Sequence, residues 1–258
     1  MRTVLADFHI HTLLSPCAEI EMTPHHIVLR AAEFGIGAIA VTDHNASANV
    51  KAALAAGERY GVKVFPGMEV ECLEEAHIVV LFDNLAQIEA WQQLVDKHMS
   101  GLLNNAEKFG GQFVVDDDDN FIREEERMLL APLQLTAAEV VQAVSRLGGI
   151  SIAAHIDRPS YSIVGQLGFI EPDFGFAAAE ISAAGWRQGM QDKLQRLAGY
   201  LPFATSSDAH NILDFIRGPK NLLTVNELSI EELVLALARS GGRSWLPGQF
   251  ADFSELEI

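Results

Sequence analysis

The chain has 258 residues, a length that suits one large α/β barrel or two small domains. Hydrophobic residues make up 49% of it, which is enough for a sizeable buried core. The formal net charge is −17, from 18 Lys and Arg against 35 Asp and Glu. Because phosphate backbones require clustered basic residues, stable nucleic-acid binding is not expected.

Membrane spans and disulfides are not expected either. No apolar run reaches the roughly 18 residues that a membrane span requires. The opening MRTVLADFHIH lacks the basic segment and apolar stretch of a signal peptide. Two cysteines, Cys17 and Cys72, are too few for a disulfide framework. We therefore expect a cytoplasmic protein with no membrane partner.

Short apolar runs rich in β-branched residues recur along the chain and predict strands. They lie at Val4–His11, Ala38–His44, Lys63–Glu71, His77–Phe82, Gly149–Ile156, Ala177–Ser182 and Phe203–Asp208. Many of the gaps between them have the pattern of helices. Alternating strands and helices indicate an α/β fold with a parallel sheet, and this length favours a closed barrel.

Several helix ends can be predicted from local residue types. Thr23 and Pro24 suit an N-cap and first helical residue before His25–Phe34. Thr136 with Glu139, and Ser229 with Glu232, fit the capping-box spacing. Gly35 and Gly148 stand where helices should end.

An acidic segment at about 111–131 fits the barrel pattern poorly. It contains Asp116–Asp119 and Glu124–Glu126, and we interpret it as an excursion from the barrel, a lid or a loop. An acidic run is more often a solvated surface than a cation site. No linker or repeat divides the rest, so we expect residues 1–258 to form a single domain.

The histidines are concentrated at the boundaries of the predicted strands. His9 and His11 are two residues apart on an extended segment, so both rings point to one face. Further His, Asp and Glu residues follow at later boundaries: Asp43, His44, Glu69, His77, His155, Asp208 and His210. In parallel α/β barrels these ends converge on one face, so the side chains should meet there. Histidine nitrogens and carboxylate oxygens favour Zn, Mn or Fe.

With these motifs assembled, the chain resembles the PHP family, the polymerase and histidinol phosphatase domains. The resemblance runs from DFHIHTLLSPC through AVTDHN, FPGMEVE, AHIVVLF and AAHID to SSDAH, over roughly residues 4–211. It implies a distorted (β/α)7 barrel of the TIM-like type that holds two or three divalent metals. By motif, the implied ligands are His9, His11, His44, Glu69, His77, His155, Asp208 and His210.

One stretch departs from the family pattern. Many relatives place an Asp or His shortly after HxH, where this chain has Ser15-Pro16-Cys17. Cys17 is either a ligand, which would favour Zn or Fe over Mn, or a small residue in a turn set by Pro16. Glu19 and Glu21 are further candidates for the missing ligand.

The resemblance and the charges together predict a metal-dependent phosphoesterase. Two metals about 3.5–4 Å apart can bind phosphate oxygens and lower the pKa of a bridging water. We expect Asp208 or Glu69 to bridge the metals and His210 or His155 to be available as proton donor. Asp43 is expected to orient an imidazole through its other nitrogen.

The phosphate itself is expected to meet a guanidinium. Arg158, in HIDRPS, suits this role because its fork matches phosphate geometry, although a structural salt bridge is the alternative. Ser160 and Asn45 are expected to assist. The predicted substrate is a small phosphorylated metabolite or nucleotide. The alternatives are an amidohydrolase-like enzyme acting on C–N bonds and a non-catalytic metal-binding regulatory module.

Overall fold

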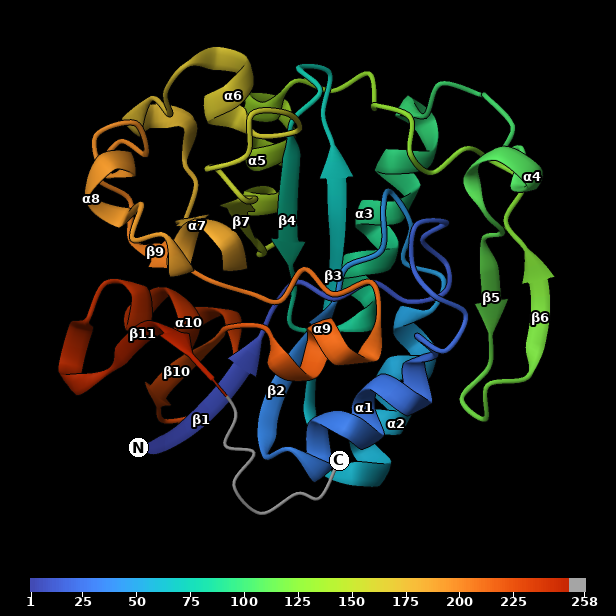
Figure 1. Ribbon diagram of the computed structural model, residues 1–258, viewed down its shortest axis with the longest axis horizontal. Coiled ribbons are helices and arrows are strands. Elements are labelled where there is room, and N and C mark those ends of the chain that lie inside the picture. Colours follow the sequence, from blue (N-terminus) through green and yellow to red (C-terminus); the bar gives the residue numbers. More distant parts are fainter. Residues whose placement is uncertain (251–258) are drawn as a thin grey trace.

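Nine strands form one curved sheet that nearly closes into a barrel (Figure 1). The structure is a computed structural model and describes residues 1–250. The strands lie in the order β11-β10-β1-β2-β3-β4-β7-β8-β9. Their bounds are β1 Arg2–Asp7, β2 Ile36–Val41, β3 Lys63–Glu71, β4 His77–Leu81, β7 Ile150–Ala153, β8 Ala178–Glu180, β9 Phe203–Ala204, β10 Lys220–Val225 and β11 Ser244–Gln249.

The sheet is mixed, which corrects the expectation of a parallel sheet. β1, β2 and β3 are parallel to one another, as are β7, β8 and β9. β4 is antiparallel to both of its neighbours, and β10 is antiparallel to both β1 and β11. Hydrophobic periodicity predicts that a strand exists but not its direction. The predicted barrel-like α/β fold is nevertheless confirmed.

The two ends of the sheet approach each other through side chains. The amide of Gly248, near the end of β11, donates a hydrogen bond of 3.0 Å to Oγ1 of Thr205, the residue that follows β9. Asn221 on β10 accepts from the Thr205 amide at 3.1 Å and from Trp245 Nε1 at 2.8 Å. These bonds connect β9 to β10 and β11, so the barrel is held together where no strand ladder joins these edges in residues 1–250.

Helices cover the outside of the sheet (Figure 1). The longer ones are α1 Pro24–Glu33, α2 Val50–Tyr60, α3 Leu85–His98, α5 Ala137–Arg146 and α10 Ile230–Leu237. Shorter helices are α4 Ala106–Phe109, α6 Ile163–Leu167, α7 Ala183–Arg187, α8 Gln191–Leu194 and α9 Ile212–Arg217, with single 3-10 turns at η1 Pro172–Phe174 and η2 Ser240–Gly242. None of the helices within residues 1–250 is long and apolar enough to cross a membrane.

The predicted helix ends are confirmed with one exception. Thr23 caps α1, Thr136 and Glu139 form a complete capping box, and Gly35 adopts a left-handed conformation after α1. The Ser229 box is only half formed. Its hydroxyl accepts from the Glu232 amide, but the Glu232 carboxylate binds Asn226 and Arg243 instead.

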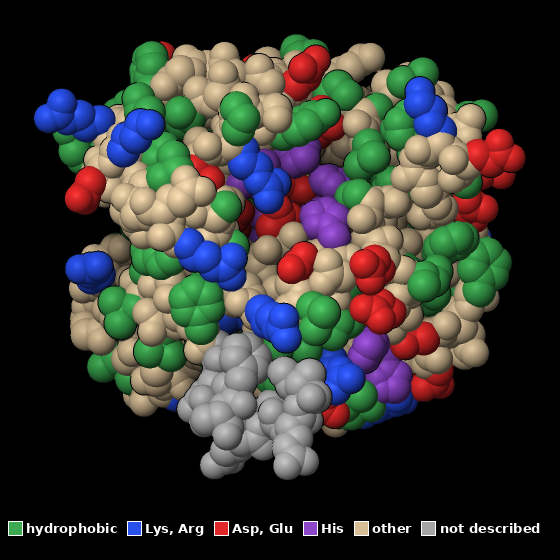
Figure 2. All heavy atoms as spheres, in the orientation of Figure 1, with side chains coloured by type: hydrophobic (Ala, Val, Ile, Leu, Met, Phe, Trp, Pro, Cys, Tyr) green, Lys and Arg blue, Asp and Glu red, His purple; other side chains and the backbone are tan. Residues whose placement is uncertain are grey.

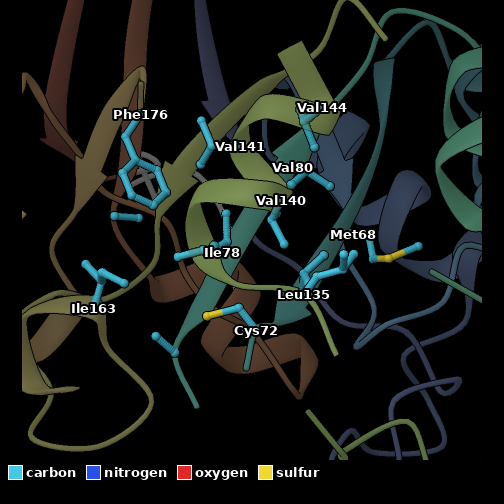
Figure 3. Close-up of a cluster of buried hydrophobic side chains, with 14 of the residues drawn as sticks. Met68, Cys72, Ile78, Val80, Leu135, Val140, Val141, Val144, Ile163 and Phe176 are labelled. Carbon is cyan, nitrogen blue, oxygen red and sulfur yellow. The ribbon is translucent and has the colours of Figure 1, made fainter. Parts of the chain in front are cut away.

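Hydrophobic side chains form separate layers inside and outside the barrel. One cluster lies between the sheet and helices α3 and α5, and includes Met68, Ile78, Val80, Val140 and Phe176 (Figure 3). A second fills the barrel interior, where Phe8 packs edge-on against Phe65 and also contacts Trp245. A third packs α1, α2 and α9 against the sheet. These layers hold the strands in place, and the strands carry the His, Asp and Glu residues at their ends.

The acidic segment forms a small hairpin apart from the main sheet. β5 (Phe113–Val115) and β6 (Phe121–Glu124) pair antiparallel. Asp119 accepts from Thr23 Oγ1 at 2.5 Å, and Asp118 pairs with Arg59 of α2 at 3.1 Å. Carboxylates of the acidic run therefore tie the hairpin to α1 and α2. Its action as a lid, and the interpretation of the chain as one domain, stay predictions.

Candidate metal centre

The strand-boundary residues singled out above converge on one edge of the barrel. All seven predicted strands form, but several end before the polar residues, so His9, His44, His155 and Asp208 lie just past their strands. β4 runs in the opposite direction, and this places its first residue, His77, at the same edge. In Figure 2 the His side chains gather there with acidic side chains in a hollow of the surface.

Glu69, near the end of β3, lies at the centre of the group. Its side chain is 1% exposed, and five imidazoles lie around its two oxygens. Oε1 is 2.9 Å from His77 Nδ1, 3.1 Å from His9 Nε2 and 3.2 Å from His155 Nε2. Oε2 is 3.1 Å from His44 Nδ1 and 3.3 Å from His11 Nε2. The two oxygens thus face two different sets of imidazoles.

Asp208 supplies the second carboxylate. Its Oδ1 is 3.4 Å from Nε2 of both His9 and His11 and 3.9 Å from His210 Nδ1. Its Oδ2 accepts a hydrogen bond from the Arg158 guanidinium at 2.6 Å. Only one oxygen of Asp208 therefore faces the histidines, whereas both oxygens of Glu69 do.

Ligand atoms in this region form three groups, each compact enough for one cation. The atoms of each group lie within 4.8 Å of one another. The groups are His11, His44 and His210; His9, His11 and Asp208; and His44, Glu69 and His77. Because His11 and His44 each belong to two groups, the three are not independent sites.

Hydrogen bonds away from the centre fix the orientation of several rings. His9 Nδ1 lies 3.0 Å from Glu180 Oε1, and His210 Nδ1 lies 2.9 Å from the Asp208 carbonyl oxygen. Since both partners can only accept, each Nδ1 carries a proton, and in the neutral ring Nε2 then has the lone pair. Partners of this kind typically orient the histidine ligands of metals.

Ser15 fixes the tautomer of His11 in the same way. Its hydroxyl donates to Asp43 Oδ1 at 2.7 Å, and it accepts from the His44 amide. The remaining lone pair of Ser15 accepts from His11 Nδ1 at 3.0 Å. Asp43 therefore orients His11 through Ser15 and not by direct contact, which refines the predicted role of this carboxylate.

The residues present fit a metal centre. Nε2 of His9 and Nε2 of His11 are completely buried, and neither makes a hydrogen bond within residues 1–250. Leaving buried nitrogens without a hydrogen bond costs about 1–3 kcal/mol each, and a coordinated cation removes this cost. Imidazole nitrogens with carboxylate oxygens are a donor set typical of Zn, Mn and Fe.

The protonation states of Glu69, His44 and His210 also suit cation binding. Burial raises the pKa of Glu69, but His77, His9 and His44 outweigh it and hold that pKa well below its usual value. Burial together with His11 lowers the pKa of His210 to about 4. Burial is likewise the main cause that holds the pKa of His44 well below its usual value. At neutral pH the carboxylate is ionised and these two imidazoles are neutral, the forms that coordinate metals.

Left-handed backbone conformations cluster around this edge. Asn45 (φ 47°), His155 (φ 27°), Tyr161 (φ 57°) and Asp208 (φ 51°) all have positive φ. Residues other than glycine adopt this region at a cost of order 1–3 kcal/mol, and such residues concentrate at functional sites. The backbone is therefore strained at the positions that turn the polar side chains towards one another.

A buried ion pair contacts the segment that carries Asp208. Asp7, the last residue of β1, has its Oδ2 3.0 Å from Lys220 Nζ, and both side chains are fully buried. Lys220 also donates to the carbonyl oxygens of Phe215 and Gly218. Asp7 Oδ1 accepts from the Ser207 amide at 3.1 Å, so the pair holds the segment that carries Asp208.

The three candidates for the missing ligand lie outside the three groups. Cys17 is exposed, and its pKa is raised to about 12 by desolvation of the thiolate and by the charge of Glu69. Glu19 and Glu21 are also exposed. Ligation by Cys17 stays a prediction.

The predicted phosphate-binding residues differ in their surroundings. Asn45 is fully used within the protein, because its amide donates to the carbonyls of Leu129 and Ala131 and its oxygen accepts from the Glu71 amide. Its role in phosphate binding stays a prediction. Arg158 forms a salt bridge with Asp208, and its role in phosphate binding stays a prediction. Ser160 is exposed in the same loop, and its role stays a prediction.

Sequence reasoning missed Glu180 and Ser15. Glu180 ends β8, is 2% exposed, and contacts His9 across 171 residues of sequence. It also accepts from the His155 amide at 3.3 Å. Glu180 is the only acidic residue in the predicted strand Ala177–Ser182, and that signal could have found it. The contact of Ser15 depends on a tight turn that no local pattern predicts.

Comparisons with known proteins agree with this geometry. A segment of 124 residues is 29% identical to the DNA polymerase III PolC-type of Caldanaerobacter subterraneus subsp. tengcongensis, covering 45% of this chain and 9% of that protein. The chain thus spans about a tenth of the length of this relative. The lesion-specific endonuclease Q of Pyrococcus furiosus has a similar fold, with a TM-score of 0.66 and 20% identity over 95% of this chain and 58% of that one.

Two smaller proteins share the fold over most of their length. One, from Bifidobacterium adolescentis, is proposed to be a metal-dependent phosphoesterase, with a TM-score of 0.54 and 18% identity over 80% of this chain and 87% of that one. The other is an amidohydrolase from Chromobacterium violaceum with bound sulfate, with a TM-score of 0.56 and 18% identity over 81% and 89%. Residues 7–183 match the family described as PHP domain, more than half of the chain. The chain therefore belongs to the PHP domain family, whose members include metal-dependent hydrolases.

Proposed function

We propose that this protein hydrolyses phosphoesters of small phosphorylated metabolites or nucleotides at a centre of two or three divalent metal ions. The observation that carries the proposal is the arrangement around Glu69. A buried carboxylate lies among five imidazoles, and three of their ring nitrogens make no hydrogen bond in residues 1–250: His9 Nε2, His11 Nε2 and His155 Nδ1. A structural core has no need of such an arrangement, because it leaves buried polar atoms unsatisfied.

The ligands divide into sets that can hold neighbouring cations. Glu69 is the better candidate for a shared ligand, because its two oxygens face different histidines. Asp208 would serve one cation through Oδ1, since Arg158 occupies its other oxygen. When bound, such ions activate water for attack and neutralise charge on a phosphate.

The protein's own residues would position the substrate. The Arg158 guanidinium has further N–H groups beside the one bonded to Asp208, and a phosphate oxygen next to the metals could accept from them. Glu180, Ser15 and Asp43 would hold His9 and His11 in the orientation that directs each Nε2 to the centre. The neutral state of His210 suits a ligand better than a proton donor.

A small substrate is favoured by the charge of the chain and by the recessed position of the centre. The net charge of −17 opposes an extended polyanion, because long nucleic acids require clustered basic residues. The centre lies in a hollow of the surface (Figure 2). The structural neighbour endonuclease Q acts on DNA, so an oligonucleotide is included in the test below.

The test combines elemental analysis with a substrate panel of phosphorylated metabolites, nucleotides and a duplex oligonucleotide. We expect two to three equivalents of Zn, Mn or Fe per chain, in line with the three overlapping ligand groups, and release of phosphate from phosphorylated metabolites or nucleotides. His9→Ala should lose metal and turnover while remaining folded. His98→Ala is the matched control, because His98 lies on α3 and its side chain hydrogen-bonds, within residues 1–250, only to the Leu94 carbonyl oxygen.

Other outcomes would support the alternatives. Ammonia release from amide substrates without phosphate release would indicate an amidohydrolase. A metal-dependent gain in melting temperature, with no turnover that His9→Ala abolishes, would indicate a non-catalytic module.

A further inference from the structure

A cavity of about 540 Å³ opens beside the metal centre and shares Asp208 with it. Three arginines from separate elements line it: Arg158 after β7, Arg187 at the end of α7 and Arg217 at the end of α9. The volume lies within the range of about 300–1,000 Å³ typical of small-molecule sites. The cavity can therefore hold the part of a substrate that lies beyond the reacting phosphate.

The charges that line this cavity are unevenly satisfied. Asp157 accepts from the Ser182 amide at 2.7 Å and from its hydroxyl at 2.6 Å. Asp208 pairs with Arg158, and Asp214 accepts from the Asn211 amide group at 2.8 Å. Arg187 and Arg217, in contrast, make no side-chain hydrogen bond or ion pair within residues 1–250. In the described part of the chain, the carboxylates thus have partners, whereas the guanidiniums of Arg187 and Arg217 have none.

Two glycines hold the arginine-bearing helices close to the centre. Gly218 follows Arg217, and Ser207 precedes Asp208. A Cβ atom on Gly218 would lie only 2.5 Å from the Cβ of Ser207. A Cβ on Gly185, two residues before Arg187, would lie 2.5 Å from Asp157 Oδ2. The ends of α7 and α9 are therefore packed against the segments that lead to the metal ligands. Both arginines are carried by backbone whose position relative to the centre is fixed.

We propose that this cavity is a second anion-binding subsite, in which Arg187 and Arg217 bind an oxyanion at the far end of the substrate. Resting on the proposed phosphoesterase function, this assigns the substrate to compounds with two anionic groups, the reacting phosphate and a second phosphate or carboxylate. In a chain of charge −17, two unpaired guanidiniums in one cavity favour such a compound over a monoanionic one.

The test measures binding of phosphonates, which the enzyme cannot hydrolyse at the C–P bond. The metal-loaded protein is titrated calorimetrically with an alkylphosphonate, an alkyl bisphosphonate and a phosphonocarboxylate, with alkyl linkers of two to four carbons. At the best linker length we expect a two-anion probe to bind about tenfold or more tightly than the monophosphonate, the gain from one added charge-assisted contact. The preferred probe shows whether the second group is phosphate or carboxylate.

The double variant Arg187→Gln/Arg217→Gln should reduce this advantage to less than about threefold while retaining metal and melting temperature. Arg146→Gln is the matched control, an exposed arginine on α5 outside the cavity, and should keep the full advantage. Equal affinities of one- and two-anion probes in wild type, or an advantage that survives the double variant, would overturn the subsite. Binding of the monophosphonate alone would leave the phosphoesterase proposal standing, whereas failure of all three probes would count against both.

Discussion

Charge is buried in two adjacent places in this protein, and the two are satisfied differently. In the pair of Asp7 and Lys220, opposite charges lie 3.0 Å apart, the ammonium donates to two carbonyl oxygens, and the carboxylate accepts from the Ser207 amide. In the centre around Glu69, Nε2 of His9 and of His11 have no hydrogen-bond partner in residues 1–250. A buried charge that an opposite charge of the protein compensates serves the fold, whereas neighbouring buried ring nitrogens without hydrogen bonds indicate an external ligand.

The largest effect is expected from removing the central carboxylate. Glu69→Gln takes away the charge around which five imidazoles are arranged. We expect turnover to fall by more than about 100-fold, beyond the usual effect of altering a residue that only orients a ligand. Metal content measured with activity checks this. Full metal loading and activity in Glu69→Gln would show that the cluster, like the ion pair, is structural.

Breaking the ion pair should affect stability. Lys220→Met leaves Asp7 as an uncompensated charge in a fully buried position, which typically costs about 3–5 kcal/mol of unfolding free energy. Urea unfolding of wild type and variant gives the difference. The double variant Asp7→Asn/Lys220→Met should recover part of the loss, and a double variant no more stable than Lys220→Met would contradict this account.

Glu180→Gln tests a buried carboxylate that has a partner within the protein and also contacts a candidate metal ligand. Glu180 does not belong to a ligand group but contacts Nδ1 of His9 at 3.0 Å. Weakening this contact should reduce metal affinity by about 10–100-fold, since a neutral amide oxygen replaces the carboxylate that orients the ring. Competition with a chelator measures the affinity. Glu231→Gln, an exposed change on α10, serves as control and should bind metal as wild type does.

The smallest effect is expected at Glu125, a buried carboxylate satisfied by the protein itself. Burial raises its pKa, but hydrogen bonds from Arg127 and Arg123 outweigh this and lower it to about 2. Because the folded pKa lies below the unfolded value of about 4.3, the ionised group stabilises the protein above that pH. The stabilisation is lost as the pH falls from about 4.3 towards 2.

Unfolding free energies at pH 6 and pH 3 test this sign. Acid should destabilise wild type more than Glu125→Gln, by of order 1 kcal/mol, because the partially exposed arginines are screened by solvent. Effects of acid on the metal centre are common to both proteins and cancel in the comparison. An equal loss in both would rule out the ion pairs of Glu125 as a source of acid sensitivity.

Much of the fold and most of the residues at the candidate site could be predicted from the sequence. The seven strands and the boundary positions of Glu69, His77 and Asp208 followed from short apolar runs that end in polar residues. The directions of β4 and β10 could not be predicted, because alternation has no direction. β10 and β11 were missed as strands, since KNLLTV starts with two polar residues and SWLPGQ contains Pro and Gly.

Contacts between residues distant in sequence account for the remaining differences. Glu180 meets His9 only because β8 and β1 reach the same edge of the barrel. Asn45 follows a predicted ligand and looked available to substrate, yet its amide binds the carbonyls of Leu129 and Ala131, more than eighty residues away. Whether a polar side chain finds such a hydrogen-bond partner depends on the tertiary structure, which local sequence patterns do not reveal.

The reversal of β4 has a consequence for how such a barrel can change its specificity. Glu69 and His77 belong to one hairpin, joined by the five residues 72–76, in which the Cys72 amide donates to the Ala76 carbonyl. Lengthening this connection would shift two candidate ligands together, so it has little freedom to vary. The segments 156–177 and 211–219 carry the arginine-bearing loop and α9 and contain none of the candidate ligands, so they can be remodelled with less disturbance of the centre. New substrate preferences should therefore arise by insertion or exchange in those two segments, while the hairpin keeps its length.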